Sequence, residues 1–180
     1  ALEPRKNIEG LIQAYESLAH EMEHRPQLII AGLVTPYLKN LQRRIAPSKL
    51  REQIQLIKNP SEKEKHTLYQ GASLFVYPSF YEGFGFPPLE AMAAGVPVVA
   101  SSASSVPEVC GDAALLVNPW DVNEIKQGMR ILLEDEDVRR AHIEAGRARV
   151  REFSWERCAR QWLDLFRQCS TVESQNLDLG

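Results

Sequence analysis

The sequence predicts an α/β fold in which a parallel sheet is covered by helices on both faces. Short apolar runs such as QLIIA and VPVVA lack the polar alternation of a half-exposed strand, so they are typical of strands buried on both faces. Segments with apolar residues at helical spacing separate these runs. Because strands that alternate with helices form βαβ units, this order of elements favours a parallel sheet.

Helices and strands alternate through the first half of the chain. The predicted elements are, in order, a helix over 7–23, a strand over 27–31, a helix over 35–45, a strand over 53–57 and a helix over 61–70. The second helix has Thr35 as its cap and Pro36 in its first turn, where the missing N–H costs no hydrogen bond. Ser61 and Glu64 form the capping-box pattern that starts the third helix.

The alternation continues until the last two helices, which follow one another without a strand. The predicted elements are a strand over 73–77, a helix over 88–94, strands over 96–100 and 114–117 with a helical turn over 107–111 between them, and helices over 121–133, 137–151 and 154–168. We predict one domain over residues 1–169. Residues 170–180 form a polar tail that is expected to fray.

Composition and charge exclude several classes of function. The net charge is −3, with both signs interspersed, so a nucleic-acid-binding surface is not expected. The three cysteines lack CxxC spacing, which argues against a disulfide framework or a zinc site and favours a cytoplasmic location. No apolar run approaches the ~20 residues of a membrane span, and no signal peptide is recognisable. The opening ALEPRKN resembles a loop entering a helix, so we expect a fragment or an excised domain.

The stretch from Tyr77 to Ala100, YPSFYEGFGFPPLEAMAAGVPVVA, holds the candidate site. It consists of a strand end, a glycine-rich loop, a helix with Pro88 in its first turn and another buried strand. Glu82 is expected in the loop and Glu90 in the first turn of the helix. The two carboxylates can therefore face one pocket.

The loop before this helix has the outline of an anion site. Gly83 and Gly85 allow a ligand to approach closely and permit positive φ, and the helix directs free N–H groups toward the loop. Arg5 and Lys6, at the start of the first helix, add positive charge that suits a diphosphate. Ligands bind beyond the carboxyl ends of parallel strands. The loop lies there, and so do Arg5 and Lys6 if a strand precedes Ala1.

The two carboxylates suit the rest of a nucleotide sugar. Glu90 can accept hydrogen bonds from two vicinal ribose hydroxyls. Glu82 would then lie near the sugar, where a carboxylate stabilises the oxocarbenium character that develops as the diphosphate leaves. The residues alone indicate no more than an α/β domain with a candidate phosphate-binding loop.

A family resemblance extends this interpretation. PSFYEGFGFPPLEAMAAGVPVVAS followed by SSVPEVCGDAALLVNP resembles the carboxy-terminal, donor-binding domain of the retaining GT-B glycosyltransferases of family 4, the group 1 glycosyltransferases. PRKN near the start and FSW at Phe153–Trp155 fit the same family. The resemblance covers roughly Glu3 to Phe166. It implies a Rossmann-like domain that is one half of a GT-B fold.

The resemblance also assigns roles to residues. Glu82 is the implied catalytic residue, which contacts the donor sugar, and Glu90 binds the ribose. Sugar hydroxyls and phosphate oxygens would be held by the backbone of Gly83, Phe84 and Gly85. Lys6 would hold the diphosphate, with Arg5 as a second candidate. No metal and no other cofactor is implied.

The implied reaction is transfer of a hexosyl group, with retention, from a UDP- or GDP-sugar to a sugar or lipid-linked acceptor. Acceptor contacts in this family come mostly from an amino-terminal domain, so we expect this chain alone to be inactive. The full enzyme would associate with a membrane at most peripherally. The helix over 154–168 resembles the one that crosses back to that domain, so its apolar face is expected to be partly exposed. This face consists of Trp155, Trp162, Leu163 and Phe166.

Other interpretations stay open. The chain could be a non-catalytic nucleotide-sugar-binding subunit that works with a partner chain, or half of a nucleotide-sugar epimerase. Phe84 and Phe86 could stack on a ligand or fill the core. The DxD pattern at 135–137 joins two predicted helices, so we interpret it as an acidic helix cap and not as a metal site.

Overall fold

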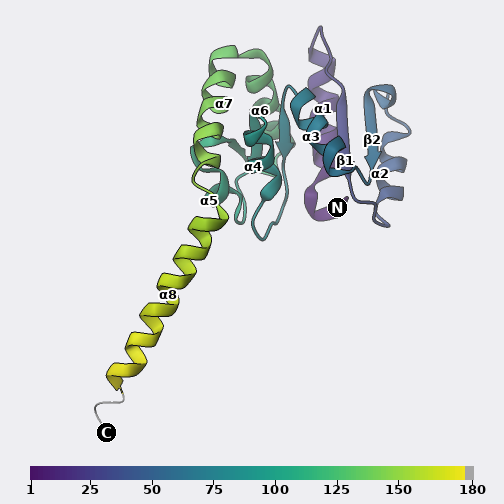
Figure 1. Cartoon of the computed structure of the whole chain (residues 1–180). Coiled ribbons are helices and arrows are strands. Elements are labelled where there is room, and N and C mark those ends of the chain that lie inside the picture. Colours follow the sequence, from purple (N-terminus) through teal and green to yellow (C-terminus); the bar gives the residue numbers. More distant parts are fainter. Residues whose placement is uncertain (177–180) are drawn as a thin grey trace.

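Helices and strands alternate along the chain as predicted (Figure 1). The structure is a computed structural model that describes residues 1–176. The strands are β1 (Leu28–Gly32), β2 (Ile54–Lys58), β3 (Phe75–Tyr77), β4 (Val98–Ser101) and β5 (Leu115–Val117). The helices are α1 (Ile8–Glu21), α2 (Leu38–Ile45), α3 (Glu62–Gly71), α4 (Phe86–Ala93), α5 (Val106–Cys110), α6 (Val122–Glu134), α7 (Glu136–Val150) and α8 (Trp155–Asn176). The predicted α/β fold is confirmed.

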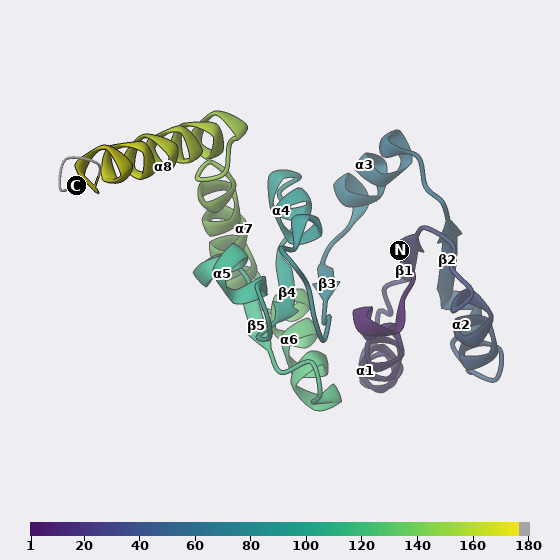
Figure 2. The ribbon, with the colours of Figure 1, turned by 90° about the horizontal axis from the view of Figure 1, so that it is seen from below.

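The strand pairs are all parallel, but they form two sheets instead of the single sheet that was expected. β1 pairs with β2, with Leu28 opposite Ile54. β4 lies between β3 and β5, so that Val99 is opposite both Val76 and Leu115. Figure 2 shows the two sheets as separate groups of arrows. The expectation of one continuous sheet is corrected because no strand of residues 1–176 joins β1 to β3.

Helices cover both faces of the sheets, as predicted. On one face, α1, α2 and α6 bury Ile12, Leu41 and Ile125 in a core shared with β1, β2 and β4. On the other face, α4 and α5 bury Met92 and Val106 against β3 and β4. β4 has a strand on each side and helices on both faces, and all of its residues are buried.

The predicted caps are partly confirmed. Ser61 and Glu64 form a complete capping box at the start of α3. Asp121, at the start of the helix predicted over 121–133, caps α6 by accepting from the N–H groups of residues 123 and 124. α2 begins at Leu38 and not at Pro36, because residues 36 and 37 form a turn in which the Leu38 N–H donates to the carbonyl of Thr35 at 3.0 Å.

α8 extends away from the rest of the molecule (Figure 1). It runs to Asn176 instead of ending near Gln168, so residues 170–176 of the tail that was expected to fray are helical. The rest of that tail, residues 177–180, lies outside the described residues. The four predicted apolar side chains of this helix are exposed, as expected: Trp155, Trp162, Leu163 and Phe166.

Two features of the structure bear on the composition of the chain, namely the state of the cysteines and the apolar character of the helices. Cys110 is buried, Cys158 and Cys169 are exposed, and all three are free thiols. Within residues 1–176, no helix has the length and the apolar character that crossing a membrane requires.

Candidate functional site

α4 begins directly after a glycine with an unusual backbone. Gly85 has a φ of +112°, which favours glycine, and the helix starts at the next residue, Phe86. Pro87 and Pro88 take its second and third positions, whose N–H groups have no partner within a helix in any case. Glu90 therefore lies in the second turn, and the prediction of a first-turn glutamate is wrong.

The loop before α4 offers free backbone donors. The N–H groups of Gly83, Phe84 and Gly85 donate no hydrogen bond to the described part of the chain. Successive N–H groups of this kind form an anion-binding concavity. The helix itself supplies fewer donors than expected, because its two prolines have no N–H. The loop backbone therefore offers more free donors than the helix for the anion site that the sequence predicts.

The two glycines of the loop differ. Gly85 has positive φ, whereas Gly83 does not. A Cβ added at Gly83 would meet no atom within 4 Å. The expectation that both glycines serve positive φ is therefore wrong for Gly83, whose small size instead leaves open space beside the loop.

Two serines that follow β4 fix the loop. The N–H of Glu82 donates to Oγ of Ser104 at 3.0 Å. Oγ of Ser105 lies 2.9 Å from the carbonyl oxygen of Glu82 and 2.8 Å from that of Phe84, so its single proton serves both. These contacts hold the carboxylate-bearing loop against the end of β4.

The carboxylate of Glu82 is buried and shared by two cations. Nζ of Lys6 lies 2.6 Å from its Oε1, and Nη1 of Arg5 lies 2.7 Å from its Oε2. Lys6 also donates to the hydroxyl of Tyr77 at 2.7 Å. Burial acts to raise the pKa of Glu82, but hydrogen bonds, chiefly from Lys6, outweigh it, so this pKa lies below its usual value. The site thus holds an ionised carboxylate and two positive charges together.

A short turn places both cations. Pro4–Lys6 forms one 3₁₀ turn before α1, and its proline is tolerated because it stands at the start. The carbonyl of Arg5 accepts from the N–H of Phe80 at 2.8 Å, which joins this turn to the glutamate loop. Asn7 then caps α1 and donates from Nδ2 to the carbonyl of Pro119 at 2.6 Å. The predicted basic pair is therefore held at Glu82 by main-chain and side-chain contacts.

Glu90 has its own pair of partners, both from α3. Its Oε1 accepts from Nζ of Lys65 at 3.0 Å, and its Oε2 accepts from the hydroxyl of Tyr69 at 3.0 Å. Tyr69 is oriented by an edge contact with the ring of Phe75 on β3, with 5.4 Å between ring centroids. Burial and then the charge of Glu90 raise the pKa of Tyr69, so its hydroxyl stays a donor at neutral pH. Each carboxylate oxygen keeps further acceptor capacity.

One cavity of about 890 Å³ is lined by Glu90 and by Lys6, which is a partner of Glu82. Lys6 and Tyr77 line it from the side of Glu82, and Lys65, Tyr69 and Glu90 line it from the other side. Glu82 does not line the cavity itself but contacts Lys6, which does. Small-molecule sites commonly have volumes of roughly 300–1,000 Å³. The structure therefore brings the predicted Lys6 and Glu90 to one cavity, whereas Arg5, Glu82 and residues 83–85 do not line it.

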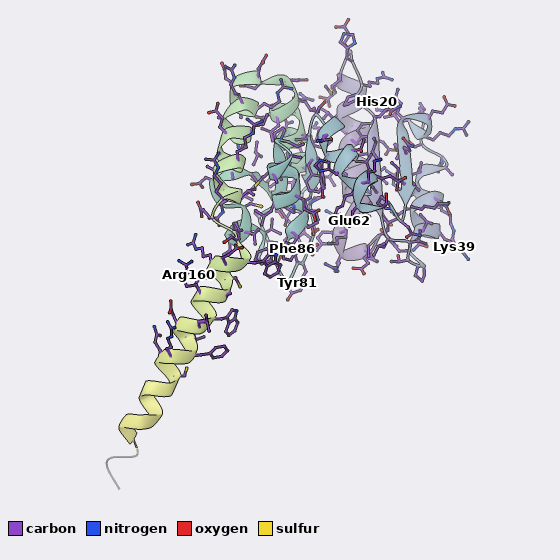
Figure 3. All side chains as sticks on the ribbon, in the orientation of Figure 1. His20, Lys39, Glu62, Tyr81, Phe86 and Arg160 are labelled. Carbon is purple, nitrogen blue, oxygen red and sulfur yellow. The ribbon has the colours of Figure 1, made fainter. Side chains whose placement is uncertain are left out.

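The loop lies at the end of the molecule from which α8 departs. Tyr81 of the loop and Phe86 of α4 are both near this end, opposite His20 (Figure 3). Phe84 and Phe86 are exposed and contact each other, with 4.7 Å between ring centroids. Phe153 adds an edge contact to Phe84. The structure thus places both phenylalanines outside the core, where they form an aromatic surface beside the loop.

Several contributing residues were missed in the sequence. Lys65 and Tyr69 lie one helical turn apart on α3, and Ser104 and Ser105 belong to the SSVPEV segment. Tyr77 was recognised only as the end of a strand. The spacing of four between Lys65 and Tyr69 was a usable signal, since it places both on one helix face.

The acidic DxD pattern is a helix cap, as predicted. The side chain of Asp135 accepts from the N–H of Val138 at 3.0 Å at the start of α7. No cluster of three or more histidine, cysteine or acidic side chains that could hold a metal ion occurs among the described residues.

Comparison with known proteins identifies the family. The profile of the family described as glycosyl transferases group 1 matches residues 1–149. O-antigen chain mannosyltransferase B of Escherichia coli is 40% identical over 166 residues, which are 92% of this chain and 44% of the relative. Serotype-specific mannosyltransferase WbdA of Escherichia coli is 37% identical over 181 residues, which are 99% of this chain and 22% of the relative. The chain spans less than half the length of these relatives.

Solved structures agree on the fold. Sucrose-phosphate synthase from Thermosynechococcus elongatus superposes with a TM-score of 0.77 at 28% identity, over 94% of this chain and 44% of that protein. An alpha,alpha-trehalose 6-phosphate synthase from Burkholderia multivorans gives a TM-score of 0.86 at 18% identity, which shows the fold alone, over 99% of this chain and 43% of that protein. These neighbours have the GT-B fold, and the chain matches less than half of each. With the family profile matched over most of its length, this chain belongs to the group 1 glycosyltransferases.

Proposed function

We propose that the chain is the donor-binding domain of a retaining glycosyltransferase of family 4, which transfers a hexosyl group from a UDP- or GDP-sugar to a sugar or lipid-linked acceptor. The observation that carries this proposal is the convergence of Lys6 and Arg5 on the buried carboxylate of Glu82, beside a cavity that also holds Glu90. Two cations, a loop of free N–H groups and two separated carboxylates suit the parts of a nucleotide sugar. The names of the mannosyltransferase relatives favour mannose as the hexose.

In the proposed complex, the diphosphate lies between the free N–H groups of 83–85 and the cations of Lys6 and Arg5. Charge-assisted hydrogen bonds from both sides neutralise its oxygens. Glu90 accepts hydrogen bonds from the ribose hydroxyls through the lone pairs that Lys65 and Tyr69 leave free. This assignment needs no metal ion, since basic side chains and backbone donors supply the positive charge.

Glu82 is the proposed catalytic residue. As the bond between C1 of the sugar and the diphosphate oxygen breaks, that oxygen takes the electron pair and C1 develops positive charge. The carboxylate of Glu82 stabilises C1, and Lys6 and Arg5 stabilise the leaving diphosphate. The acceptor hydroxyl bonds to C1 on the same face and loses its proton to the departing phosphate oxygen.

Acceptor recognition is assigned to polypeptide outside these 180 residues. The relatives are more than twice as long as the matched region, and the apolar face of α8 is exposed. The same two observations favour a second candidate function, a nucleotide-sugar-binding subunit that works only with a partner chain. On either assignment the isolated chain binds donor without transferring sugar to an acceptor.

The test begins with the isolated chain. A thermal-shift screen with UDP-, GDP- and ADP-sugars is expected to raise the Tm with one of them, since a ligand that binds only the native state stabilises it. If none of them raises the Tm and none is bound by calorimetry, the proposal fails. NMR of the product made by the longer parent protein then reports whether the anomeric configuration is retained. Conversion of the donor sugar without an acceptor would instead indicate an epimerase.

A further inference from the structure

A second pocket, of about 410 Å³, lies where the start of α1 meets the segment between β5 and α6. Asn7 and Glu9 line it from the first side, and Pro119 and Trp120 line it from the other. No residue of the described chain lines both this pocket and the large cavity at Glu90. Its volume lies within the range of roughly 300–1,000 Å³ that is common for small-molecule sites. We call it the Trp120 pocket.

The backbone around Trp120 is held in place by two neighbouring side chains. Asn7, which is buried, donates from Nδ2 to the carbonyl of Pro119 at 2.6 Å. The N–H of Trp120 donates to Oδ1 of Asn118 at 3.1 Å. The indole also stacks on the ring of Phe80, with 5.6 Å between ring centroids and 29° between ring planes. The orientation of the indole is therefore fixed, although the residue is 67% exposed.

α1 supplies polar groups to the same pocket. Glu9 and Gln13 both line it and are four positions apart, which places them on one face of the helix. Oε1 of Glu9 accepts from the hydroxyl of Tyr37 at 2.7 Å. Burial, and then this hydrogen bond, raise the pKa of Tyr37, so its hydroxyl stays a donor at neutral pH. The carboxylate of Glu9 keeps further acceptor capacity, and the amide of Gln13 can both donate and accept.

The lining of the Trp120 pocket favours a neutral ligand with many hydroxyl groups. Among the described residues, no lysine or arginine lines the pocket, and the carboxylate of Glu9 repels an anion. A purely apolar ligand would leave polar groups without partners, which is costly. The π face of an indole is negative and attracts polarised C–H groups. Because a pyranose ring presents C–H groups on its face and hydroxyls at its edge, a sugar matches both the indole and the polar side chains.

The Trp120 pocket shares its supports with the proposed donor site. Pro4 lines the pocket and belongs to the 3₁₀ turn that carries both cations of the donor site. Phe80 also lines the pocket and lies two positions before Glu82. The N–H of Phe80 donates to the carbonyl of Arg5 at 2.8 Å. One turn and one loop therefore border both places, so a sugar chain with its reacting end at the donor site could extend to the pocket.

We propose that the Trp120 pocket binds a neutral hexose unit of the acceptor's sugar chain, away from the reacting end. The inference rests on the proposed function, since a transferase that extends a glycan handles such a chain. The pyranose ring stacks on Trp120, and its hydroxyls bond to Glu9 and Gln13. The reacting end is still held by polypeptide outside these 180 residues. A second contact along the same glycan strengthens its binding because the two contacts are linked.

Binding of neutral trisaccharides to the chain 1–180, without any nucleotide, tests this proposal. Mannotriose is the first probe, since mannose is the hexose favoured above, and maltotriose is the second. In proton–nitrogen correlation NMR spectra, at least one of them is expected to shift the indole N–H signal of Trp120, which Trp120→Phe identifies. Trigalacturonate, a trisaccharide with carboxylates, is expected to cause no shift. The proposal is overturned if neither neutral probe shifts this signal.

A substitution of the indole gives a second readout. Trp120→Ala is expected to weaken trisaccharide binding by about tenfold or more, as truncation of a central aromatic contact does. Trp155→Ala is the matched control, because Trp155 is 79% exposed and lies on α8, so its affinity should equal that of the natural chain. The Tm of each variant verifies that it is folded. Equal affinities in the two variants would overturn the proposal.

The same probes are then applied to the longer parent protein. Saturation-transfer NMR is expected to detect trisaccharide binding there, weakened again by Trp120→Ala. Loss of binding in the parent protein would mean that other polypeptide covers the pocket, and it would overturn the proposal.

A failure of this inference is distinguishable from a failure of the proposed function. If the natural chain binds a UDP- or GDP-sugar but neither trisaccharide, this inference alone is refuted. If it binds a trisaccharide but no nucleotide sugar, the pocket is a sugar site and the proposed donor function is refuted.

Discussion

Nζ of Lys6 lies 2.6 Å from Oε1 of Glu82, although the two residues are 76 positions apart in the sequence. Lys6 is partly buried and Glu82 is buried, so the contact is shielded from solvent. A lysine in this position can hold the carboxylate when the site is empty and also contact an anion in the neighbouring cavity. We therefore expect this pair to link the stability of the site to the binding of phosphate.

Replacing Lys6 with methionine is expected to weaken binding of UDP or GDP by about 10- to 100-fold, which corresponds to the loss of a charged hydrogen bond. Isothermal titration calorimetry measures this change. Lys126→Met is the matched control, because Lys126 is 15% exposed against 16% for Lys6 and also pairs with a glutamate, Glu21. Equal affinity in the Lys6 variant and the control contradicts a diphosphate role for Lys6.

Glu82 is expected to make the stability depend on pH in the acidic range. Its pKa is lower in the folded chain than the value of about 4.3 in an unfolded one. Its contribution is therefore fully present above the unfolded pKa and is lost as the pH falls through the folded pKa. Glu82→Gln should be less stable than the natural chain at pH 7, and this difference should shrink as the pH falls toward 3.

Urea unfolding at several pH values between 3 and 7 measures this dependence. Glu52→Gln is the control, since the side chain of Glu52 is almost fully exposed. A difference between the Glu82 variant and the natural chain that stays constant over this range would show that ionisation of Glu82 is not the cause.

Glu90→Ala is expected to weaken UDP binding by about 10-fold or more, because a carboxylate that accepts from ribose hydroxyls is lost. The affinity for inorganic pyrophosphate, which has no ribose, should not change. A 2′,3′-dideoxynucleoside diphosphate should bind the natural chain and the variant equally. Calorimetry with these three ligands separates a ribose contact from general damage, since damage would lower all three affinities together.

The partners of Glu90 provide a further comparison. Tyr69→Phe removes the hydroxyl that donates to Oε2 but keeps the ring contact with Phe75. We expect a smaller loss of UDP affinity than in Glu90→Ala, since Lys65 still orients the carboxylate. A loss as large as that of Glu90→Ala would mean that the tyrosine itself contacts the nucleotide.

The exposed face of α8 is expected to promote self-association. Trp155 and Trp162 are 79% and 55% exposed, and large exposed apolar patches mark contact surfaces. Replacing both with glutamine should reduce concentration-dependent association in analytical ultracentrifugation and change the free energy of unfolding by no more than about 0.5 kcal/mol. Arg160→Gln, on the same helix (Figure 3), is the control. Unchanged association in the double variant would contradict the expectation that this face of α8 mediates self-association.

The sequence predicted the elements well because apolar periodicity and turn residues are local signals. Short runs such as 27–31 and 96–100 lie where the parallel strands β1 and β4 form. The break between β1 and β3 was not predictable, because strand pairing depends on which chain segments meet in space and no local pattern reports it. The late start of α2 has a similar origin, since its Thr35 hydroxyl also contacts the distant carbonyl of Leu2.

The site was predicted in part. Motif resemblance indicated Glu82, Glu90 and Lys6, and the structure brings Lys6 and Glu90 to one cavity. The residues that hold them were missed, because a lysine or tyrosine that orients a carboxylate looks like any surface residue until the fold brings the two together. Lys65, which lies 25 positions before Glu90, is an example. Such contacts arise from tertiary packing.

Gly83 and Gly85 are expected to respond differently to alanine. Gly85→Ala places a Cβ on a residue with φ of +112°, which should cost about 1–2 kcal/mol or more and shift the start of α4. Gly83→Ala has ordinary φ and open space, so its free energy of unfolding should change by less than about 0.5 kcal/mol. Its added methyl group would nevertheless stand beside the free N–H groups of the loop and hinder a phosphate. Urea unfolding together with calorimetry of UDP binding should therefore show a stability defect in one variant and a binding defect without a stability defect in the other. If Gly83→Ala binds UDP as tightly as the natural chain, the loop backbone does not approach the ligand closely at that residue.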